Sequence, residues 1–432
     1  MNVLERYFKL KENSTDLKTE LVAGVTTFLT MSYIIFVNPS ILENAGMDDN
    51  AVLVATCLAA AIGSLIMGLY ANLPIALAPG MGLNAYFTYG VVIGMGIPWQ
   101  TALGAVFLSG VGFVILSLTP AREWIVKAIP RDLKYAMASG IGLFLVIIGL
   151  SDAGIIVDNP ATLVSLGDIT SPVVLLAIAC FFIIAVLDTR KFPGAILVGI
   201  LAITIVGNFT GASTFNGIMS APPDISPTLF AFDPVSAFDL TLAAVVISLL
   251  FVDTFEATGT FIGIAQPAGL VNDKGEIPNL SRAMLSDSLA TVAGAVVGTS
   301  TTTSYVESVA GVKAGGRTGL TAITVATLFL FGPFFAPLAG AIESYATGAA
   351  LVYIGCVMAA SIAKIDWEEE TTYIPCLIMA VSMPLTFSIA TGIGFGFISY
   401  AFLKIASGKY APDQVGIAVL ALLFLGKFTF LN

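Results

Sequence analysis

Two short stretches of this 432-residue chain decide how it folds. Residues 72–86 read NLPIALAPGMGLNAY, and residues 298–311 read GTSTTTSYVESVAG. Both lie among long apolar runs, yet each is interrupted by glycine, proline or hydroxyl-bearing residues. The run of Ser and Thr favours extended backbone, and Ala78-Pro79 suits a helix start because proline fits the first turn. We therefore expect each stretch to be an extended segment followed by a short helix.

The overall composition places these stretches inside a membrane. Hydrophobic residues make up 57% of the chain and charged residues only 11%, whereas a soluble domain carries roughly 25% charged residues. Such a chain can cover its surface with lipid. Non-helical backbone at membrane depth survives only where protein or a cavity satisfies it. We therefore expect the two interrupted stretches to meet near the bilayer midplane, with their helix N-termini directed at one shared site.

The other apolar runs predict an all-α polytopic membrane protein. Each run is close to the roughly 20 residues that a membrane-spanning helix needs. The predicted spans are 20–42, 51–71, 99–118, 131–151, 172–188, 193–209, 236–263, 281–298, 317–338, 344–364, 371–387 and 389–406. The interrupted pieces 78–92 and 304–315 bring the total to fourteen. Residues 413–429 form an additional apolar segment, which either crosses the membrane or lies at its interface.

The distribution of positive charge supports this count and gives an orientation. With a cytoplasmic N-terminus and fourteen crossings, every Lys and Arg except Lys427 falls on the cytoplasmic side, as the positive-inside rule requires. The predicted outer loops carry neither Lys nor Arg: 43–50, 93–98, 152–171, 210–235 and 339–343.

Fourteen spans divide into two sets of seven, and an odd number per half forces the halves into opposite orientation. The halves share weak sequence echoes in the same order. Leu58, Ala59, Gly63 and Gly80 recur as Leu289, Ala290, Gly294 and Gly311, and Ala136, Ile141 and Gly142 recur as Ala349, Ile354 and Gly355. The sequence thus predicts a seven-plus-seven inverted repeat in which the two interrupted stretches correspond to each other.

Four carboxylates fall inside the apolar spans: Asp253, Glu256, Asp287 and Glu307. Each costs roughly 2.5–3.5 kcal/mol to insert, so each needs a reason. Structural reasons would be a helix cap for Glu307 and a core hydrogen bond for Asp253 or Asp287. The chain has no histidine, so carboxylates must carry any proton chemistry. Asp253 and Glu256 lie on one helix face and are the candidates, with the choice between them open.

Three motifs around these residues resemble those of the AzgA-like purine permeases, a branch of the nucleobase–cation symporter-2 (nucleobase–ascorbate transporter) family. They read APGMGLNAYF from Ala78, FVDTFEATGTFIG from Phe251, and GTSTTTSYVESVAGV from Gly298, followed by GGRTG from Gly315. The resemblance implies a homodimer in the bacterial inner membrane that takes up hypoxanthine, guanine or adenine with protons.

The resemblance also implies a division into two domains. The core domain would comprise spans 1–4 in residues 20–118 and spans 8–11 in residues 236–338. The gate domain would comprise spans 5–7 in residues 131–210 and spans 12–14 in residues 344–406. Residues 413–429 would be an extra C-terminal segment.

By position, Glu307 resembles the family's base-binding carboxylate on span 10, and Glu256 resembles a second carboxylate on span 8. The branch commonly has Asp where Glu256 stands. The related uracil branch has a histidine where this chain has Thr260, so a histidine relay is excluded here.

A purine base is flat, neutral and rich in paired hydrogen-bonding groups, and these residue types could hold it. Glu307 could accept from two adjacent N–H groups, and N–H groups from Ala78 to Gly80 could donate to the 6-oxo group. Asn84 could bind the base or brace the backbone. The other candidates are the hydroxyl of Thr303 and four rings that could stack on the base, those of Phe255, Tyr305, Tyr86 and Phe87.

Other functions fit the sequence less well. A net charge of −10 without a basic patch gives no reason to expect nucleic-acid binding, and four cysteines without CxxC spacing give none for a metal or cofactor. An anion transporter of the sulfate or bicarbonate type is the main alternative, but its site should lack buried acids. An intramembrane aspartyl protease would need its aspartates within the membrane, whereas the nearest signature, SLGD ending at Asp168, lies in an outer loop. A channel remains open, and concentrative uptake would exclude it.

Overall fold

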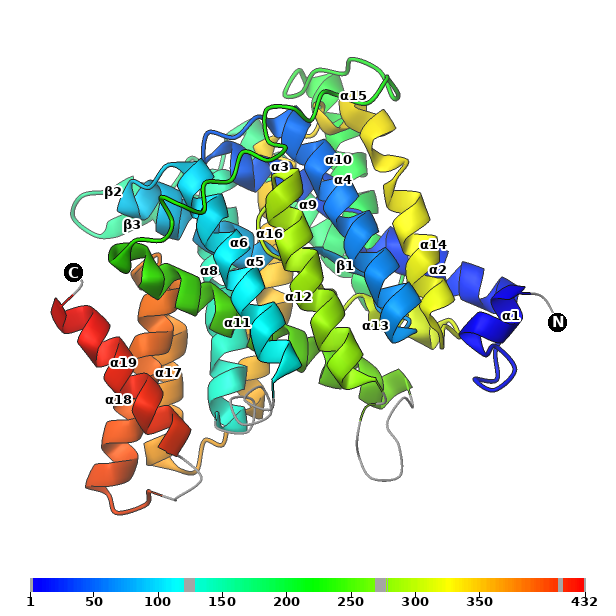
Figure 1. The fold of residues 1–432 in the computed structure, drawn as a ribbon. Coiled ribbons are helices and arrows are strands. Elements are labelled where there is room, and N and C mark those ends of the chain that lie inside the picture. The colour runs from blue at the N-terminus through cyan, green and yellow to red at the C-terminus, as the bar shows by residue number, and fades with distance from the viewer. Residues whose placement is uncertain (1–2, 120–128, 269–276, 278, 411–414, 431–432) are drawn as a thin grey trace.

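The structure is a computed structural model that describes residues 3–119, 129–268, 277, 279–410 and 415–430. Nearly all of the regular structure in these ranges is helical, and ten of the described helices are long and apolar enough to cross a membrane. The protein is therefore a polytopic integral membrane protein, as the composition predicts. Figure 1 shows the helices running side by side through the body of the molecule.

The described elements follow one another along the chain in a regular order. The helices are α1 (Val3–Phe8), α2 (Leu17–Met31), α3 (Ile34–Glu43), α4 (Asp49–Ile66), α5 (Met81–Ala85), α6 (Trp99–Leu118), α8 (Arg131–Asp152), α9 (Pro172–Thr189), α10 (Ala195–Thr210), α11 (Leu240–Ala268), α12 (Leu280–Val297), α13 (Ser308–Lys313), α14 (Gly319–Phe329), α15 (Ala336–Ala339), α16 (Ser344–Ala359), α17 (Glu370–Leu385), α18 (Ile389–Ala406) and α19 (Val415–Phe430). The strands are β1 (Leu77–Pro79), β2 (Ile156–Asn159), β3 (Leu163–Leu166) and β4 (Thr302–Ser304).

Most predicted spans match a helix to within a few residues, but two of them are interrupted. The first span is interrupted between α2 and α3, at Ser32 and Tyr33. The predicted span 317–338 is divided into α14, a 3₁₀ turn over Gly332–Phe335 and α15. Pro333 explains the second interruption, because proline removes a backbone donor and clashes with the preceding turn. The predicted outer loop 152–171 contains a hairpin of β2 and β3 that the sequence analysis did not anticipate.

The two interrupted stretches meet in the interior, as predicted. Strand β1 pairs antiparallel with β4, with Ala78 opposite Thr303. Two further backbone bonds extend the pairing, from Gly80 N–H to the Thr301 carbonyl (2.9 Å) and from Tyr305 N–H to the Ala76 carbonyl (3.0 Å). Each strand leads into a short helix, α5 after β1 and α13 after β4.

The start of the first short helix differs from the prediction. Pro79 is the last residue of β1, Gly80 is the N-cap, and α5 begins at Met81. Pairing with β4 keeps Ala78 and Pro79 extended, so the tertiary contact overrides the local preference of proline for a helical first turn.

The helices form two packed groups. In one, α12 packs against α4 and α6, and α14 packs against α2 and α4. In the other, α8 packs against α16 and α17, α9 packs against α10 and α16, and α17 packs against α18. Figure 1 shows α17, α18 and α19 at the opposite end of the molecule from α1.

Small residues let α8 and α16 approach closely. A Cβ atom on Gly142 would lie 2.6 Å from the Gly355 carbonyl oxygen, and one on Gly355 would lie 2.5 Å from the Gly142 carbonyl oxygen. Glycine at such a crossing allows helix backbones to touch. Gly142 and Gly355 are also corresponding residues in the predicted repeat, so this contact is reciprocal between the two halves.

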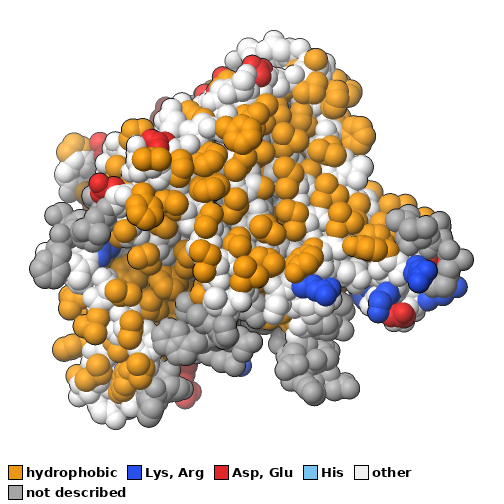
Figure 2. All heavy atoms as spheres, viewed as in Figure 1, with side chains coloured by type: hydrophobic (Ala, Val, Ile, Leu, Met, Phe, Trp, Pro, Cys, Tyr) orange, Lys and Arg blue, Asp and Glu red, His pale blue; other side chains and the backbone are white. Residues whose placement is uncertain are grey.

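The surface agrees with a chain that crosses a bilayer. Figure 2 shows a broad apolar face, with Asp and Glu along its upper edge and Lys and Arg, mixed with some Asp and Glu, toward its lower edge. In the second packed group, Lys404 donates to Glu369 at 2.8 Å. This contact, with hydroxyl bonds from Thr371 and Thr372, holds the pKa of the Glu369 carboxyl at about 2. The ion pair ties the start of α17 to the end of α18.

Candidate functional site

Glu307 lies at the N-cap position of α13, where the sequence analysis placed it, but its side chain makes no capping hydrogen bond. Its Oε1 instead accepts a 2.6 Å hydrogen bond from the hydroxyl of Tyr33. Tyr33 is fully buried and lies at the interruption between α2 and α3. The hydrogen bond from Tyr33 therefore fixes the position of the Glu307 carboxylate, and this carboxylate does not cap the helix.

Glu256 approaches the same place from α11. Its Oε2 lies 3.9 Å from where a Cβ on Gly80 would stand, and that oxygen has no hydrogen-bond partner among the described residues. Glu256 is close enough to Glu307 for the two charges to repel each other. The place where β1 and β4 pair is called the strand crossing from here on. Two carboxylates lie beside it, one from α11 and one from the start of α13.

Gly80 is required at this crossing by the space available to it. A Cβ there would lie 2.8 Å from Cγ2 of Thr303, which is too close for a larger residue unless the Thr303 side chain shifts. The predicted role of its N–H is wrong, because that group already donates to the Thr301 carbonyl. The next three N–H groups, of Met81, Gly82 and Leu83, have no acceptor within the helix, whereas the Asn84 N–H already donates to the Gly80 carbonyl. These three groups replace Gly80 as the available donors.

Asn84 occupies a closed polar network. Its amide donates to Asn38, and Ser300 donates to its carbonyl oxygen. Asn38 in turn donates to Thr56 and Thr299, and Asn84 is fully buried. Of the two roles that the sequence left open, this arrangement favours bracing, because both ends of the Asn84 amide already have partners.

The predicted aromatic candidates are all buried: Phe255, Tyr305, Tyr86 and Phe87. The Tyr305 hydroxyl donates to the Pro79 carbonyl at 2.5 Å, which fixes its ring against β1. Phe255 stacks on Phe251, with ring centres 6.1 Å apart and planes within 9°. Tyr305 therefore lies directly at the strand crossing, and Phe255 lies on the same helix as Glu256.

Asp253 and Asp287 lie on the α11 and α12 side of β4. Asp287 accepts from Ser304 at 2.5 Å and from Thr303 at 3.4 Å. Asp253 is in contact with the Thr291 hydroxyl at 2.8 Å through Oδ2, while its Oδ1 has no partner among the described residues. Both side chains are at most 1% exposed. The four carboxylates of the sequence analysis thus gather around a single strand.

The sequence analysis did not identify two buried residues, Tyr33 and Glu20, because neither stands out in the sequence. Tyr33 lies in the apolar stretch MSYIIF, where an aromatic residue is ordinary. Glu20 stands at the polar edge of the first span, yet it is fully buried. Its carboxylate accepts from the backbone N–H groups of Arg317 (2.9 Å) and Thr321 (3.2 Å) at the start of α14.

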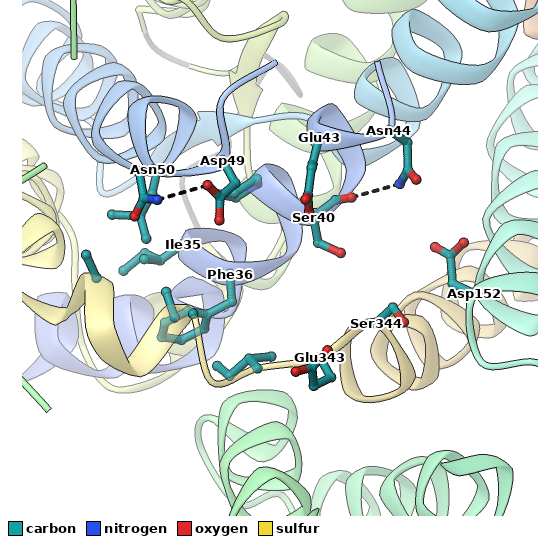
Figure 3. Close-up of a pocket in the computed structure, with 16 residues that line it drawn as sticks. Ile35, Phe36, Ser40, Glu43, Asn44, Asp49, Asn50, Asp152, Glu343 and Ser344 are labelled. Atoms are coloured by element: carbon teal, nitrogen blue, oxygen red, sulfur yellow. Dashed lines mark hydrogen bonds between the residues drawn. The ribbon is translucent and has the colours of Figure 1, made fainter. Parts of the chain in front are cut away.

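A separate cavity of about 490 Å³ lies where the predicted outer loops 43–50 and 339–343 meet the end of α8. Figure 3 shows the carboxylates of Glu43, Asp49, Asp152 and Glu343 around it. Its wall includes Ile35 and Phe36 on α3, next to Tyr33 in the chain. None of the site residues predicted from the sequence lines this cavity.

Comparison with known proteins gives a consistent family assignment. The model described as "Permease family" (Xan_ur_permease) matches residues 18–395. The chain is 48% identical to adenine permease AdeP of Escherichia coli strain K12, over 100% of this chain and 97% of that protein. It is 46% identical to guanine/hypoxanthine permease PbuO of Bacillus subtilis strain 168, over 96% of this chain and 98% of that protein.

Solved structures of similar fold are more distant in sequence. The transmembrane domain of the cyanobacterial bicarbonate transporter BicA has a TM-score of 0.63 at 16% identity and covers 94% of this chain and 97% of its own. SLC26A9 has a TM-score of 0.66 at 10% identity and covers 94% of this chain and 66% of its own. At these identities the likeness concerns the fold alone. The match over residues 18–395 and the full-length relatives show that the chain belongs to the Permease family, the nucleobase–cation symporter-2 family that its motifs resemble.

Proposed function

We propose that this protein is a secondary transporter that brings purine nucleobases into the cell. Two kinds of observation support the proposal. Full-length relatives are named adenine permease and guanine/hypoxanthine permease. The observation that carries it in this chain is a hydrogen-bonded carboxylate, Glu307, facing a second carboxylate, Glu256, at the crossing of two buried strands.

The geometry suggests how a base would be held. Tyr33 donates to Oε1 of Glu307, which leaves the other carboxylate oxygen available to accept from a purine N–H. Glu256 Oε2, which lacks a partner, can accept from a second N–H. The backbone N–H groups of Met81 to Leu83 can donate to a ring nitrogen or a 6-oxo group, and Tyr305 provides a ring beside them. Paired acceptors and donors of this kind recognise a base by its edge.

We further propose that the ten long helices, together with the shorter segments at α5, α10, α13 and α17, make fourteen spans in a seven-plus-seven inverted repeat. The antiparallel pairing of β1 with β4 and the reciprocal contact of Gly142 with Gly355 support this arrangement. The packed group of α2, α4, α6, α12 and α14 would belong to the core domain, and the group of α8, α9, α10, α16, α17 and α18 would form the gate domain.

The remaining parts of the proposal concern orientation, partners and coupling. A cytoplasmic N-terminus in the bacterial inner membrane is supported by the separation of acidic and basic edges in Figure 2. A homodimer is proposed from the family resemblance. Protons would drive uptake, and either Glu256 or Asp253 is the carboxylate proposed to respond to them. Transport by an anion mechanism is not favoured, because Glu256 and Glu307 would repel an anion at the strand crossing.

Uptake of radiolabelled adenine, guanine and hypoxanthine into proteoliposomes tests the function. We expect at least one base to accumulate inside against its concentration gradient, and a protonophore to abolish this accumulation. Accumulation rather than equilibration separates a transporter from a channel. Uptake of sulfate or bicarbonate without uptake of any base would refute the proposal.

Tyr33→Phe tests whether the hydroxyl positions Glu307. The variant removes one hydrogen bond to a charged group, worth roughly 1.5–3 kcal/mol, while keeping the ring. We expect base affinity to fall about three- to tenfold, since the freed carboxylate must be reordered on binding. The measurement is calorimetric titration of purified protein with guanine or adenine.

The control for Tyr33→Phe is a double-mutant cycle. If the hydroxyl acts through Glu307, Tyr33→Phe should add little to the effect of Glu307→Gln. Independent effects of the two changes would show that Tyr33 acts through some other group.

A further inference from the structure

Asp253 and Asp287 form a pair that the base-binding geometry does not use. Asp287, on α12, accepts from Thr303 and Ser304 of strand β4. Asp253, on α11, accepts from Thr291 of α12, whose hydroxyl also lies within hydrogen-bond distance of the Thr302 carbonyl of β4. Thr303 lies between them, with its hydroxyl 3.4 Å from Asp287 and within reach of Asp253. The two carboxylates are close enough to interact electrostatically. Two aspartates from different helices therefore converge on one residue of β4.

The surroundings of the pair contain unpaired acceptors and no described cation partner. Asp253 Oδ1 has no hydrogen-bond partner among the described residues, although Asp253 is only 1% exposed. The hydroxyl of Thr302, which is fully buried, also lacks a partner there. A buried carboxylate oxygen without a donor is costly, so a ligand that supplies positive charge or a proton would relieve it.

The donors are distributed unequally over the pair. Asp287 receives the hydroxyls of Ser304 and Thr303. Asp253 faces the Thr291 hydroxyl, which also lies 2.9 Å from the Thr302 carbonyl and has one hydrogen to give. Among the described residues, Glu256 also acts electrostatically on both carboxylates, and it is negative as well. Adjacent buried carboxylates do not both stay ionised without a compensating cation.

We propose that Asp253 and Asp287 together bind one monovalent cation, a proton or Na⁺, and that this cation drives transport. The inference rests on the proposed transport function and deepens it, because it separates the cation site from the base site. Glu256 and Glu307 hold the base, whereas Asp253 and Asp287 hold the cation. In the proton case, the proton adds to a carboxylate oxygen of the pair and leaves from the same oxygen, with no other bond changed.

Strand β4 connects the two sites. Thr303 presents its hydroxyl to Asp287 and its methyl group to Gly80, where Cγ2 lies 2.8 Å from the place of a glycine Cβ. Ser304, the next residue, donates to Asp287 and precedes Tyr305, whose hydroxyl holds Pro79. A change of charge at the pair therefore acts on the same strand that forms the floor of the base site, so binding of cation and base can be linked.

The test uses the full-length protein in proteoliposomes, with Asp253→Asn, Asp287→Asn and the double variant. Asparagine keeps the shape of aspartate and mimics its neutral form. Asp158→Asn, an exposed aspartate of β2, is the matched control. Three quantities are measured: accumulation of labelled base under a proton gradient and, separately, a Na⁺ gradient; exchange of labelled for unlabelled base without a gradient; and base affinity by calorimetry.

We expect each single variant to lose gradient-driven accumulation, while exchange and base affinity stay within about threefold of the wild type. The double variant should behave like the single variants, because one shared cation is lost only once. Loss of the response to the proton gradient identifies the cation as a proton, and loss of the response to the Na⁺ gradient identifies it as Na⁺. Asp158→Asn should accumulate base normally.

Normal gradient-driven accumulation by either single variant would overturn the proposal. Base affinity shows whether a variant is folded, and the two single variants are independent, so a variant that fails to fold leaves the other as the test. A wild-type protein that binds and transports no base would instead reject the proposed function. Glu256→Gln should differ from both variants by losing base affinity as well as accumulation.

Discussion

Replacing Glu307 with glutamine is expected to weaken purine binding by about tenfold or more. The change keeps the shape of the side chain but turns one acceptor oxygen into an N–H donor. Tyr33 would retain the remaining oxygen, so a purine N–H would face the new amide N–H. A hydrogen bond to a charged group is worth roughly 1.5–3 kcal/mol, and an unpaired buried donor adds to the loss. Each 1.4 kcal/mol is a factor of about ten in affinity.

Calorimetric titration of purified wild-type and variant protein with guanine, hypoxanthine and adenine measures this loss. Glu368→Gln, an exposed residue before α17, makes the same chemical change away from the site and should bind normally. The melting temperature of Glu307→Gln should change little, because the Glu307 side chain makes no capping bond. Near-native affinity in Glu307→Gln would remove Glu307 from the base site.

Replacing Glu20 with alanine is expected to cause a large loss of stability. The Glu20 carboxylate receives the backbone N–H groups of Arg317, Thr318 and Thr321, and also the Thr321 hydroxyl at 2.6 Å. Glu20 is fully buried, so alanine would leave the N–H groups of Arg317 and Thr318 without this acceptor and would remove the nearest acceptor of the Thr321 hydroxyl. A buried unsatisfied group costs roughly 1–3 kcal/mol, and the variant should lose about 3 kcal/mol or more.

Thermal unfolding of the purified protein in detergent measures the effect of Glu20→Ala. Glu20→Gln should be intermediate, since its amide still offers one acceptor oxygen. Glu12→Ala is the matched control, because the Glu12 side chain is 70% exposed and pairs only with Lys9 at the surface. Such exposed ion pairs contribute little to the stability of a fold. A Glu20→Ala protein with an unchanged melting temperature would show that α14 does not depend on this carboxylate.

Local sequence predicted most of the fold. Long apolar runs gave the helices, and the predicted span 131–151 differs from α8 (Arg131–Asp152) by one residue at its end. The Ser and Thr run gave β4, because these residues disfavour helix without help from distant contacts. The same local reasoning placed the start of α5 too early, since it could not include the pairing of Ala78 and Pro79 with β4.

The residues of the candidate site also fall into two groups, those that the sequence identified and those that it did not. The sequence alone identified Asp253, Glu256, Asp287 and Glu307, because a carboxylate in an apolar span is costly wherever it faces. It did not identify Tyr33, which lies 274 residues from its partner and looks like any aromatic residue in an apolar helix.

Taken by itself, the sequence determined that the chain belongs in a membrane, where its long apolar helices lie and which acidic residues fall inside them. Composition and local spacing carry those facts, because they depend on transfer from water to lipid. Only the tertiary structure decided that Tyr33 donates to Glu307, that Glu20 caps α14, that Asp253 bonds to Thr291 of α12 and that Asp287 bonds to strand β4. These pairings join residues distant in the chain, and they arise from the packing of whole helices around the β1–β4 crossing, which no local pattern encodes.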